Sequence, residues 1–402
     1  MIPFAPPFID QATIDEVVDT LKSGWITTGP KAKKLEQMIT DYCGCQKTLC
    51  LNSATAGLEL VLRWFGVGPG DEVILPAYTY SATANVVIHC GATPVLVDVN
   101  EHDFNINIEA IAKKINSKTK VIMPVDFAGL PCDYDEIVQL VASKKEIFEG
   151  QTDNQIKLGR VLVLSDAAHS LGAEYKSKKT GCLADFTCFS FHAVKNMTTA
   201  EGGTICINLP LPFDADDEYK KFYRTSLHGQ TKDALAKMQK GAWEYDIVEA
   251  GYKCNMPDML AAIGIAGMNT YQKIGLPFRK KIFETYTNGL KKYDWAITPI
   301  QDTETKNSSC HVYALRIKGC SVEKRNAIIQ SIFDEDVAVN VHFKPIPLLT
   351  FYKNMGYDII DYPVTLKLYS EEISLPIHQH LQEEDVLKVQ NAVIKSVAKH
   401  VG

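Results

Sequence analysis

The sequence predicts an α/β protein with a mostly parallel sheet, followed by a smaller α+β lobe. Short apolar runs without polar alternation recur along the first half of the chain and alternate with stretches of helical periodicity. Strands of this kind are buried on both faces, as in a parallel sheet covered by helices on each side. The length of 402 residues, with 46% hydrophobic and 22% charged side chains, suits one large domain and a smaller one.

The first part of the chain supplies the elements of that sheet. Apolar runs predict strands at residues 49–52, 71–76, 93–99, 120–125, 160–164, 186–189 and 204–208. Apolar side chains at helical spacing predict helices at residues 10–22, 31–42, 53–65, 84–90, 108–115, 134–144 and 258–268. We expect the first helix to be capped by Asp10 or Thr13 and to stop at Ser23 and Gly24.

The remainder of the chain predicts the second lobe. A long helix at residues 276–293 should bridge a large domain of residues 1–270 to a small domain of residues 271–402. Within the small domain we expect strands at residues 311–317 and 338–342 and helices at residues 322–335 and 383–399. Two polar stretches interrupt the pattern. Residues 145–157 should form an exposed insertion, and residues 230–245 belong to a mobile excursion with a helix near residues 233–240.

Composition excludes several classes of function. The net charge of −6 and the pI of about 6.0 give no reason to expect a nucleic-acid or anionic-membrane partner. No apolar run approaches the length of a membrane span, and the first residues lack the pattern of a secretory signal. The 11 cysteines are scattered without zinc-ligand spacing, so we expect no metal site and reduced thiols in a cytoplasmic protein.

Lys195 stands out among the charged residues. It lies in the stretch FSFHAVKNMTTAEGG at residues 189–203, where its neighbours along the chain are aromatic or hydroxyl-bearing rather than charged. A partly desolvated lysine loses its proton more readily, which Schiff-base chemistry needs. A surface lysine in a turn is the alternative that this stretch alone leaves open.

Three further stretches follow predicted strands. Residues 53–57, SATAG, place small residues and hydroxyls at a helix start, where free N–H groups bind an anion; ordinary capping is the alternative. Asp166 follows the strand at residues 160–164 and is either a ligand-binding carboxylate or a helix cap. The loop at residues 25–30 suits a sugar ligand or is a simple connector. Neither a P-loop nor a dinucleotide-binding glycine motif occurs.

Together these features match one kind of cofactor. Ala54 and Thr55, with Ser190, would bind a phosphate, and Tyr80 would stack on a flat ring. Asp166 would pair with a protonated pyridine nitrogen, and Lys195 would form a Schiff base with an aldehyde. A lysine with a carboxylate partner for the pyridinium is the pattern of pyridoxal-phosphate enzymes.

The chain resembles the DegT/DnrJ/EryC1/StrS family of pyridoxal-phosphate sugar aminotransferases. The resemblance runs nearly end to end and combines eight motifs in family order. They are SGWITTGP (23–30), SATAG (53–57), PAYTYSAT (76–83), DAAHSLGA (166–173), SFHAVKNMTTAEGG (190–203), GYKCNMPD (251–258), VHFKPI (341–346) and SLPIH (374–378). Each motif alone is weak, whereas the ordered set is highly specific.

The resemblance implies roles for individual residues. It implies a three-layer fold of the aspartate-aminotransferase type. Lys195 would be the Schiff-base lysine and proton shuttle, and His169 would lie beside the cofactor ring. Asn255 would reach the site of a second subunit, because family sites form at a homodimer interface. The sugar-nucleotide pocket would be lined by Ile26, Thr27, Thr28 and Gly29 and by the loop from His342 to Pro345. For Trp25 and His342, a packed structural side chain is the alternative.

The resemblance also implies a reaction. Some members carry His where a lysine is expected and dehydrate the sugar, so Lys195 favours transamination. The expected donor is glutamate, and the expected acceptor is a nucleotide-linked 4-keto-6-deoxyhexose for amino-sugar or polysaccharide synthesis. A 3-keto-sugar aminotransferase, a sugar dehydratase and a non-catalytic cofactor-binding regulator are the alternatives. Residues 145–157 and 230–245 are longer than is usual in the family.

Overall fold

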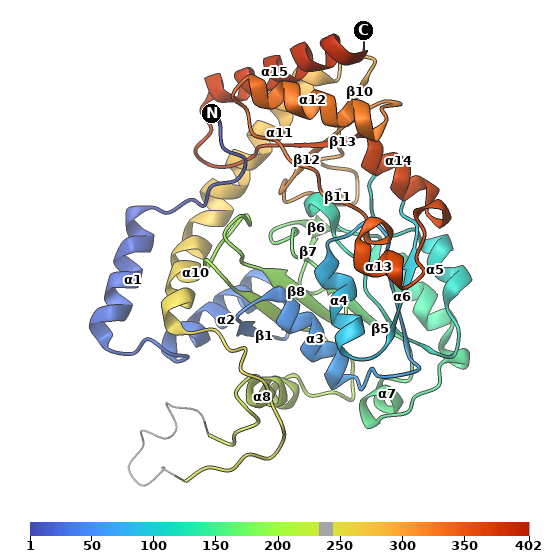
Figure 1. The fold of residues 1–402 in the computed structure, drawn as a ribbon. Helices are drawn as coiled ribbons and strands as arrows, with labels where there is room; N and C mark the ends of the chain where they lie inside the picture. Colours follow the sequence, from blue (N-terminus) through green and yellow to red (C-terminus); the bar gives the residue numbers. More distant parts are fainter. Residues whose placement is uncertain (233–243, 402) are drawn as a thin grey trace.

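The computed structural model describes residues 1–232 and 244–401 (Figure 1). A seven-stranded sheet forms its centre. In spatial order its strands are β1 (Lys47–Leu51), β9 (Gly203–Ile207), β8 (Phe186–Ser190), β5 (Leu162–Asp166), β4 (Thr119–Ile122), β2 (Glu72–Pro76) and β3 (Thr93–Val97).

The sheet is mostly parallel, as the sequence predicts. Strands β3, β2, β4, β5 and β8 pair in parallel, whereas β9 is antiparallel to both β8 and β1. The parallel strands therefore direct their carboxyl ends to one edge, where ligands bind in open α/β sheets. The predicted helix at residues 233–240 lies outside the described residues.

Helices cover both faces of the sheet. The helices around it are α2 (Pro30–Cys43), α3 (Ala54–Trp64), α4 (Ser81–His89), α5 (Ile108–Lys114), α6 (Tyr134–Ser143), α8 (Ala215–Thr225) and α10 (Asp258–Thr270). Successive strand residues pack into different clusters. Val73 and Leu75 join the cluster with α3, α4 and α8, whereas Ile74 joins the one with α5 and α6. This burial on both faces explains why the strands read as unbroken apolar runs.

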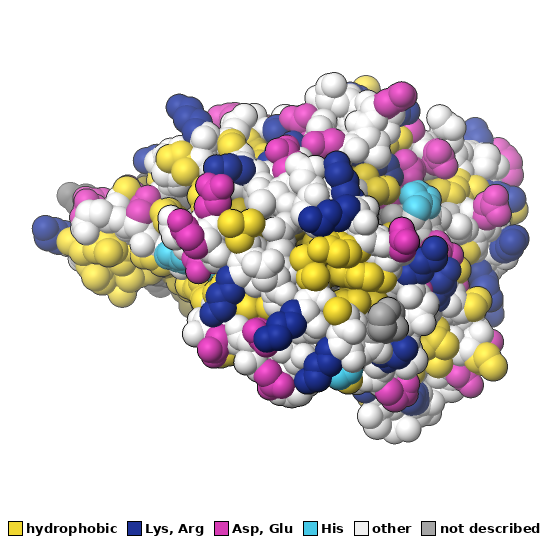
Figure 2. Space-filling model, turned by 90° about the horizontal axis from the view of Figure 1, so that it is seen from above, with side chains coloured by type: hydrophobic (Ala, Val, Ile, Leu, Met, Phe, Trp, Pro, Cys, Tyr) yellow, Lys and Arg dark blue, Asp and Glu magenta, His cyan; other side chains and the backbone are white. Residues whose placement is uncertain are grey.

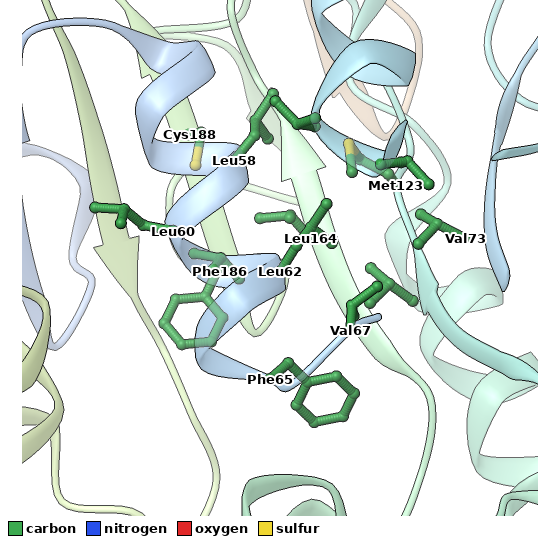
Figure 3. Packing of buried hydrophobic residues seen from close by; sticks show 14 of the residues in the cluster. Leu58, Leu60, Leu62, Phe65, Val67, Val73, Met123, Leu164, Phe186 and Cys188 are labelled. Carbon is green, nitrogen blue, oxygen red and sulfur yellow. The ribbon is translucent and has the colours of Figure 1, made fainter. Parts of the chain in front are cut away.

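Helix α3 lies at the centre of one face. Its apolar side chains pack against Phe186 and Leu164 from the sheet (Figure 3). On the opposite face, α2 and α10 pack together over Phe189 and Cys206. Because the side chains in both layers are closely packed, the strand ends and the first turn of α3 have well-defined positions.

The second lobe is a small α+β unit. Its three-stranded antiparallel sheet contains β10 (Ala296–Ile297), β12 (Tyr313–Ile317) and β13 (Glu372–Leu375). One apolar cluster joins this sheet to α11 (Leu276–Leu290), α12 (Val322–Asp334) and α15 (Glu383–Val401). The N-terminal arm joins it too, because Ile2 N–H donates to Asp336 O (2.8 Å) and Ile2 O accepts from Ala338 N–H (3.0 Å).

The remaining elements are short or peripheral. They are α1 (Gln11–Ser23), α7 (Asp153–Leu158), α13 (Thr350–Asn354), α14 (Pro363–Glu371), β6 (Glu174–Tyr175), β7 (Lys178–Lys179), β11 (Lys306–Asn307), and single turns at Phe127–Gly129, Lys145–Ile147, Ile346–Leu348 and Ile359–Asp361. Helix α1 is capped by Asp10, whose carboxylate accepts from Thr13 N–H (2.8 Å), and ends at Gly24 in the left-handed region, as predicted.

The two lobes are joined along a continuous helical rod. Helix α10 passes through the π-helical turn Tyr271–Gly275 directly into α11. The proposed boundary between residues 270 and 271 stays a prediction. Beyond this boundary, part of the chain packs against the large lobe again. Ile346 and Tyr352 lie in the core beside α3, and Tyr352 Oη donates to Asn85 Oδ1 (2.6 Å).

Two local predictions differ from the structure. Residues 338–342 do not form a strand: only Asn340 bridges to Ser374, because the chain then turns to line a cavity. Residues 145–157 are mostly exposed, as predicted, but they differ from a plain insertion because they contain most of α7 and the fully buried Gln155. The Gln155 amide donates to the Phe65 carbonyl (2.9 Å) at the end of α3. A buried hydrogen bond of this kind cannot be recognised from the polar composition of the segment.

Candidate active site

A cavity of about 600 Å³ opens at the carboxyl edge of the sheet. Strands β2, β5 and β8 end at it, and the segment at residues 340–344 covers it from the side of the small lobe. Of the residues predicted from the sequence, those that line it are Ala54, Thr55, Tyr80, Asp166, His169, Ser190, Lys195 and His342.

Asp166 is the last residue of β5 and is almost fully buried. Its carboxylate accepts hydrogen bonds from Thr83 Oγ1 (2.8 Å) and from Ala168 N–H (3.2 Å). Burial raises the pKa of Asp166, while these two donors and the nearby charge of Lys195 lower it. A buried carboxylate whose hydrogen-bond donors are both neutral is well suited to pair with a cation inside the cavity.

Lys195 lies in a turn five residues beyond β8, where its N–H donates to His192 O (2.9 Å). Burial lowers the pKa of its ammonium group to about 8, against the charge of Asp166, which raises it. An appreciable fraction of the Lys195 amine is therefore neutral near physiological pH, which a nucleophilic amine requires.

The first turn of α3 forms an anion site at the floor of the cavity. Ser53 caps the helix by accepting from Ala56 N–H (3.1 Å). The N–H groups of Ala54 and Thr55 have no acceptor in the described part of the chain, and they lie at the positive end of the helix dipole. Gly203 keeps this floor open, because a Cβ there would lie 2.2 Å from Ala54 N.

Two buried histidines lie beside Lys195. The rings of His169 and His311 are 4.3 Å apart, and burial lowers the pKa of each well below its ordinary value, so both are neutral. His169 Nδ1 is buried and has no hydrogen-bond partner among residues 1–232 and 244–401. This unpaired nitrogen indicates a ligand atom that the protein itself does not supply.

An aromatic side chain of the predicted loop at residues 342–345 also lines the cavity. The Phe343 ring is 5.7 Å from that of His169, in a stacked arrangement, and 5.7 Å from that of Tyr80. Phe343 thus contacts the two side chains predicted to flank a cofactor ring. Tyr80 itself is 61% exposed and forms part of the rim.

Asn196, the residue after Lys195, fixes His311. Its Oδ1 accepts from His311 Nδ1 (2.7 Å), and its Nδ2 donates to Ser309 O (2.9 Å) and Tyr271 Oη (3.1 Å). Sequence reasoning missed this pair and the role of Thr83. Asn196 and Thr83 belong to two of the eight family motifs, which could have indicated a role in the site. His311 begins an apolar run that predicts only a strand.

Several predicted residues do not line this cavity. Thr28, Ile26, Thr27 and Gly29 lie in a loop fixed to the segment before α10, and Asn255 Nδ2 donates to Thr28 Oγ1. Thr28 Oγ1 donates in turn to Met256 O (2.6 Å), and Gly29 N–H donates to Asp258 Oδ1 (2.8 Å). Pro345, also outside the lining, is buried just before the turn at Ile346–Leu348.

The fold and site define an aminotransferase. The chain belongs to the DegT/DnrJ/EryC1/StrS aminotransferase family, whose family model matches residues 7–394. This membership confirms the resemblance found in the sequence motifs.

Solved structures and curated proteins cover nearly the whole chain. A putative sugar aminotransferase from Streptococcus pneumoniae, Spr1654, is 48% identical in its pyridoxamine-phosphate form, with a TM-score of 0.96 over 99% of this chain and 100% of its own. The spore coat polysaccharide biosynthesis protein SpsC of Bacillus subtilis is 34% identical over 98% of this chain and 96% of its own. The UDP-4-amino-4-deoxy-L-arabinose–oxoglutarate aminotransferase of Shewanella sediminis is 34% identical over 98% of both.

The cofactor is pyridoxal 5′-phosphate, as both the family and the solved pyridoxal-phosphate form of Spr1654 indicate. The residues present fit this group. The free N–H groups of Ala54 and Thr55 suit its phosphate, Asp166 suits its ring nitrogen, and the unpaired His169 Nδ1 suits a polar group at the ring edge.

We expect Gly203→Ala to weaken pyridoxal-phosphate binding by roughly tenfold or more, because its Cβ would push the first turn of α3 out of place. Absorbance titration of the apoprotein measures the dissociation constant. Gly68→Ala is the matched control, since a Cβ there meets no atom within 4 Å. Equal affinity in both variants would show that the α3 turn does not bind the phosphate.

The rate at which apoprotein Lys195 attaches the cofactor aldehyde should rise with pH about a midpoint near 8, because only the neutral amine reacts. Stopped-flow absorbance, with the Lys195→Ala background subtracted, gives this profile. Asp166→Asn should move the midpoint lower, since the charge that raises the pKa of Lys195 is removed. A wild-type midpoint near the ordinary value of 10.5 would contradict the desolvation of Lys195.

Proposed function

We propose that this protein transfers an amino group from L-glutamate to a nucleotide-linked keto-sugar, with a 4-keto-6-deoxyhexose as acceptor. The observation that carries the proposal is the placement of Lys195, with its lowered pKa, in one cavity with Asp166. The names of SpsC and of the aminoarabinose aminotransferase place these relatives in polysaccharide and amino-sugar synthesis. PseC of Helicobacter pylori, 27% identical with a TM-score of 0.87, is an aminotransferase of pseudoaminic acid biosynthesis.

The bound cofactor supplies an aldehyde and an electron-accepting ring. Lys195 Nζ would hold the cofactor through its aldehyde and would move a proton to and from the substrate carbon. Asp166 keeps the ring nitrogen protonated, which its burial without a charged hydrogen-bond partner favours. Ala54, Thr55 and Ser190 line the cavity and would bind the phosphate, and Tyr80 and His169 would flank the ring.

The acceptor sugar occupies the outer part of the cavity. Tyr80, His342 and Lys344 line the cavity, Tyr80 and Lys344 are exposed, and a 600 Å³ space has room for more than the cofactor. Lys344 is exposed and positively charged, so it suits the diphosphate of a nucleotide-linked sugar. The two substrates react in turn at the same atoms, which makes the reaction ping-pong.

We propose that the active form is a homodimer in the cytoplasm. Asn255 and residues 26–29 do not reach the cavity of their own chain, and a second subunit would use them. Helix α1 exposes Ile14, Val18 and Leu21, and Figure 2 shows hydrophobic side chains gathered at the projecting tip, on the side where Figure 1 places α1. No helix in the described ranges is long and apolar enough to cross a membrane.

With glutamate and a panel of nucleotide keto-sugars, the protein should yield a product bearing one amino group in place of the ketone. Mass spectrometry and NMR of the product locate the new amine. Lys195→Ala should reduce turnover by at least about a thousandfold, because the proton-transfer group is lost.

The same panel separates the alternatives. Amination at carbon 3 would identify the protein as a 3-keto-sugar aminotransferase, and loss of water without nitrogen transfer would identify it as a dehydratase. A yellow protein that does not bleach with glutamate would indicate a non-catalytic cofactor-binding regulator. Unreduced turnover in Lys195→Ala would overturn the role of Lys195.

The shared-site proposal predicts complementation between two inactive variants. Mixed and refolded Lys195→Ala and Asn255→Ala subunits should recover about a quarter of wild-type activity, because half of the dimers then carry one intact site. Activity assays combined with light scattering test this. If the mixture stays inactive while heterodimers are present, Asn255 does not serve the partner's site.

A further inference from the structure

A buried carboxylate contacts His342, a histidine that lines the cavity. Glu372, the first residue of β13, is fully buried and does not itself line the cavity. Its Oε2 accepts from His342 N–H (3.0 Å), and its Oε1 accepts from Ser374 Oγ. Neither Glu372 nor Ser374 lines the cavity, so both can affect a ligand there only through His342.

Ser374 connects Glu372 to the ring of His342. Ser374 Oγ lies 2.8 Å from His342 Nδ1, so the three side chains form a continuous hydrogen-bonded chain. The backbones are fixed as well, because Asn340 and Ser374 exchange N–H···O bonds of 3.1 and 2.8 Å. Phe4 stacks on the His342 ring at 5.6 Å between centroids. The ring therefore has one defined orientation.

The other ring nitrogen of His342 is the one that remains available to a ligand. His342 lines the cavity, and its Nε2 has no partner within the described ranges. Burial and the charge of Lys195 lower the pKa of His342 to about 3, so the imidazole is neutral and carries one proton on one of its two nitrogens. Which nitrogen carries it decides whether Nε2 donates or accepts.

A hydroxyl can donate only one hydrogen bond, and this restricts the chain to two arrangements. When Ser374 donates to a Glu372 carboxylate, it accepts from His342 Nδ1–H, and Nε2 presents a lone pair. When a protonated Glu372 donates to Ser374, that hydroxyl donates to Nδ1, and Nε2 presents an N–H.

We propose that Glu372 acts through Ser374 to set the hydrogen-bond polarity of His342 Nε2 toward the acceptor substrate. As an acceptor, Nε2 binds a sugar hydroxyl or an amine; as a donor, it binds a carbonyl or phosphate oxygen. Glu372 and Ser374 are positioning residues, since they act through His342. The predicted effect on sugar binding rests on the proposed function, whereas the predicted protonation of one or the other His342 nitrogen does not.

Both arrangements are accessible near neutral pH. Burial raises the pKa of Glu372 to about 8, against the two hydrogen bonds it accepts and the charge of Arg325. Arg325 Nη1 donates to Glu372 O (2.9 Å) rather than to the carboxylate. The other titratable groups that face this chain are Tyr78, Tyr369, Lys195, His169 and His311.

Histidine-selective ¹⁵N NMR of the holoenzyme tests the proposal, with His342 assigned by the signal lost in His342→Asn. At about pH 9, above the pKa of Glu372, Nε2 of the wild type should have the shift of an unprotonated nitrogen. At about pH 6.5 the shifts of Nε2 and Nδ1 should exchange. Glu372→Gln should give the protonated Nε2 at both pH values, because its amide donates to Ser374.

Two controls separate this effect from others. Any pH response of His342 that remains in Glu372→Gln comes from the other titratable groups. Ser374→Thr keeps the hydroxyl and should retain the wild-type response, whereas Ser374→Ala should lose it. One unchanged His342 tautomer in wild type and Glu372→Gln at both pH values would overturn the proposal.

The proposal also predicts a kinetic effect. If the keto-sugar is the acceptor, Glu372→Gln should change its KM by roughly tenfold near pH 9 with kcat little altered, because only binding contacts change. Equal KM values would overturn the specificity role. Absence of any keto-sugar turnover in the wild type would instead reject the proposed function and leave the NMR result standing.

Discussion

The burial of the Asp166 carboxylate at the end of β5 is the constraint on which the site depends. Within the described residues, the hydrogen-bond donors to the Asp166 carboxylate are Thr83 and Ala168, which carry no charge, so the carboxylate is suited to pair with a cation inside the cavity. Burial lowers the pKa of Lys195 to about 8, although the charge of Asp166 opposes this shift by raising it. The same burial therefore prepares both a partner for a protonated ring and a nucleophilic amine.

The sheet brings these groups together because its strands run the same way. Parallel strands β2, β5 and β8 end at one edge, so residues that are far apart in sequence meet there. The antiparallel strand β9 then brings Gly203 against the first turn of α3. The phosphate site thus depends on a close backbone approach as well as on the free N–H groups of α3.

Much of this arrangement was predictable from local patterns. Unbroken apolar runs predicted strands buried on both faces, and the positions of Asp166, Lys195 and the SATAG turn after such runs predicted a common site. Long-range contacts were not predictable. Phe343 reaches the cavity from the small lobe, and His311 meets Asn196 across 115 residues, and no sequence period encodes either contact.

The polar residues of β13 illustrate the same limit. Ser374 belongs to a quoted motif, yet its contact with His342 depends on the fold of the small lobe. Residues 338–342 read as a strand because they are apolar and β-branched, but only Asn340 pairs, and the following residues leave the sheet to reach the cavity. Tertiary contacts override local propensity at this functional segment.

The attachment point of the cofactor tests the central claim most directly. The holoprotein is reduced with borohydride, digested and analysed by peptide mass spectrometry. The account predicts that the reduced pyridoxyl group is found on Lys195 alone, in stoichiometric amount. A modification spread over other lysines, or none on the peptide that contains Lys195, would contradict it.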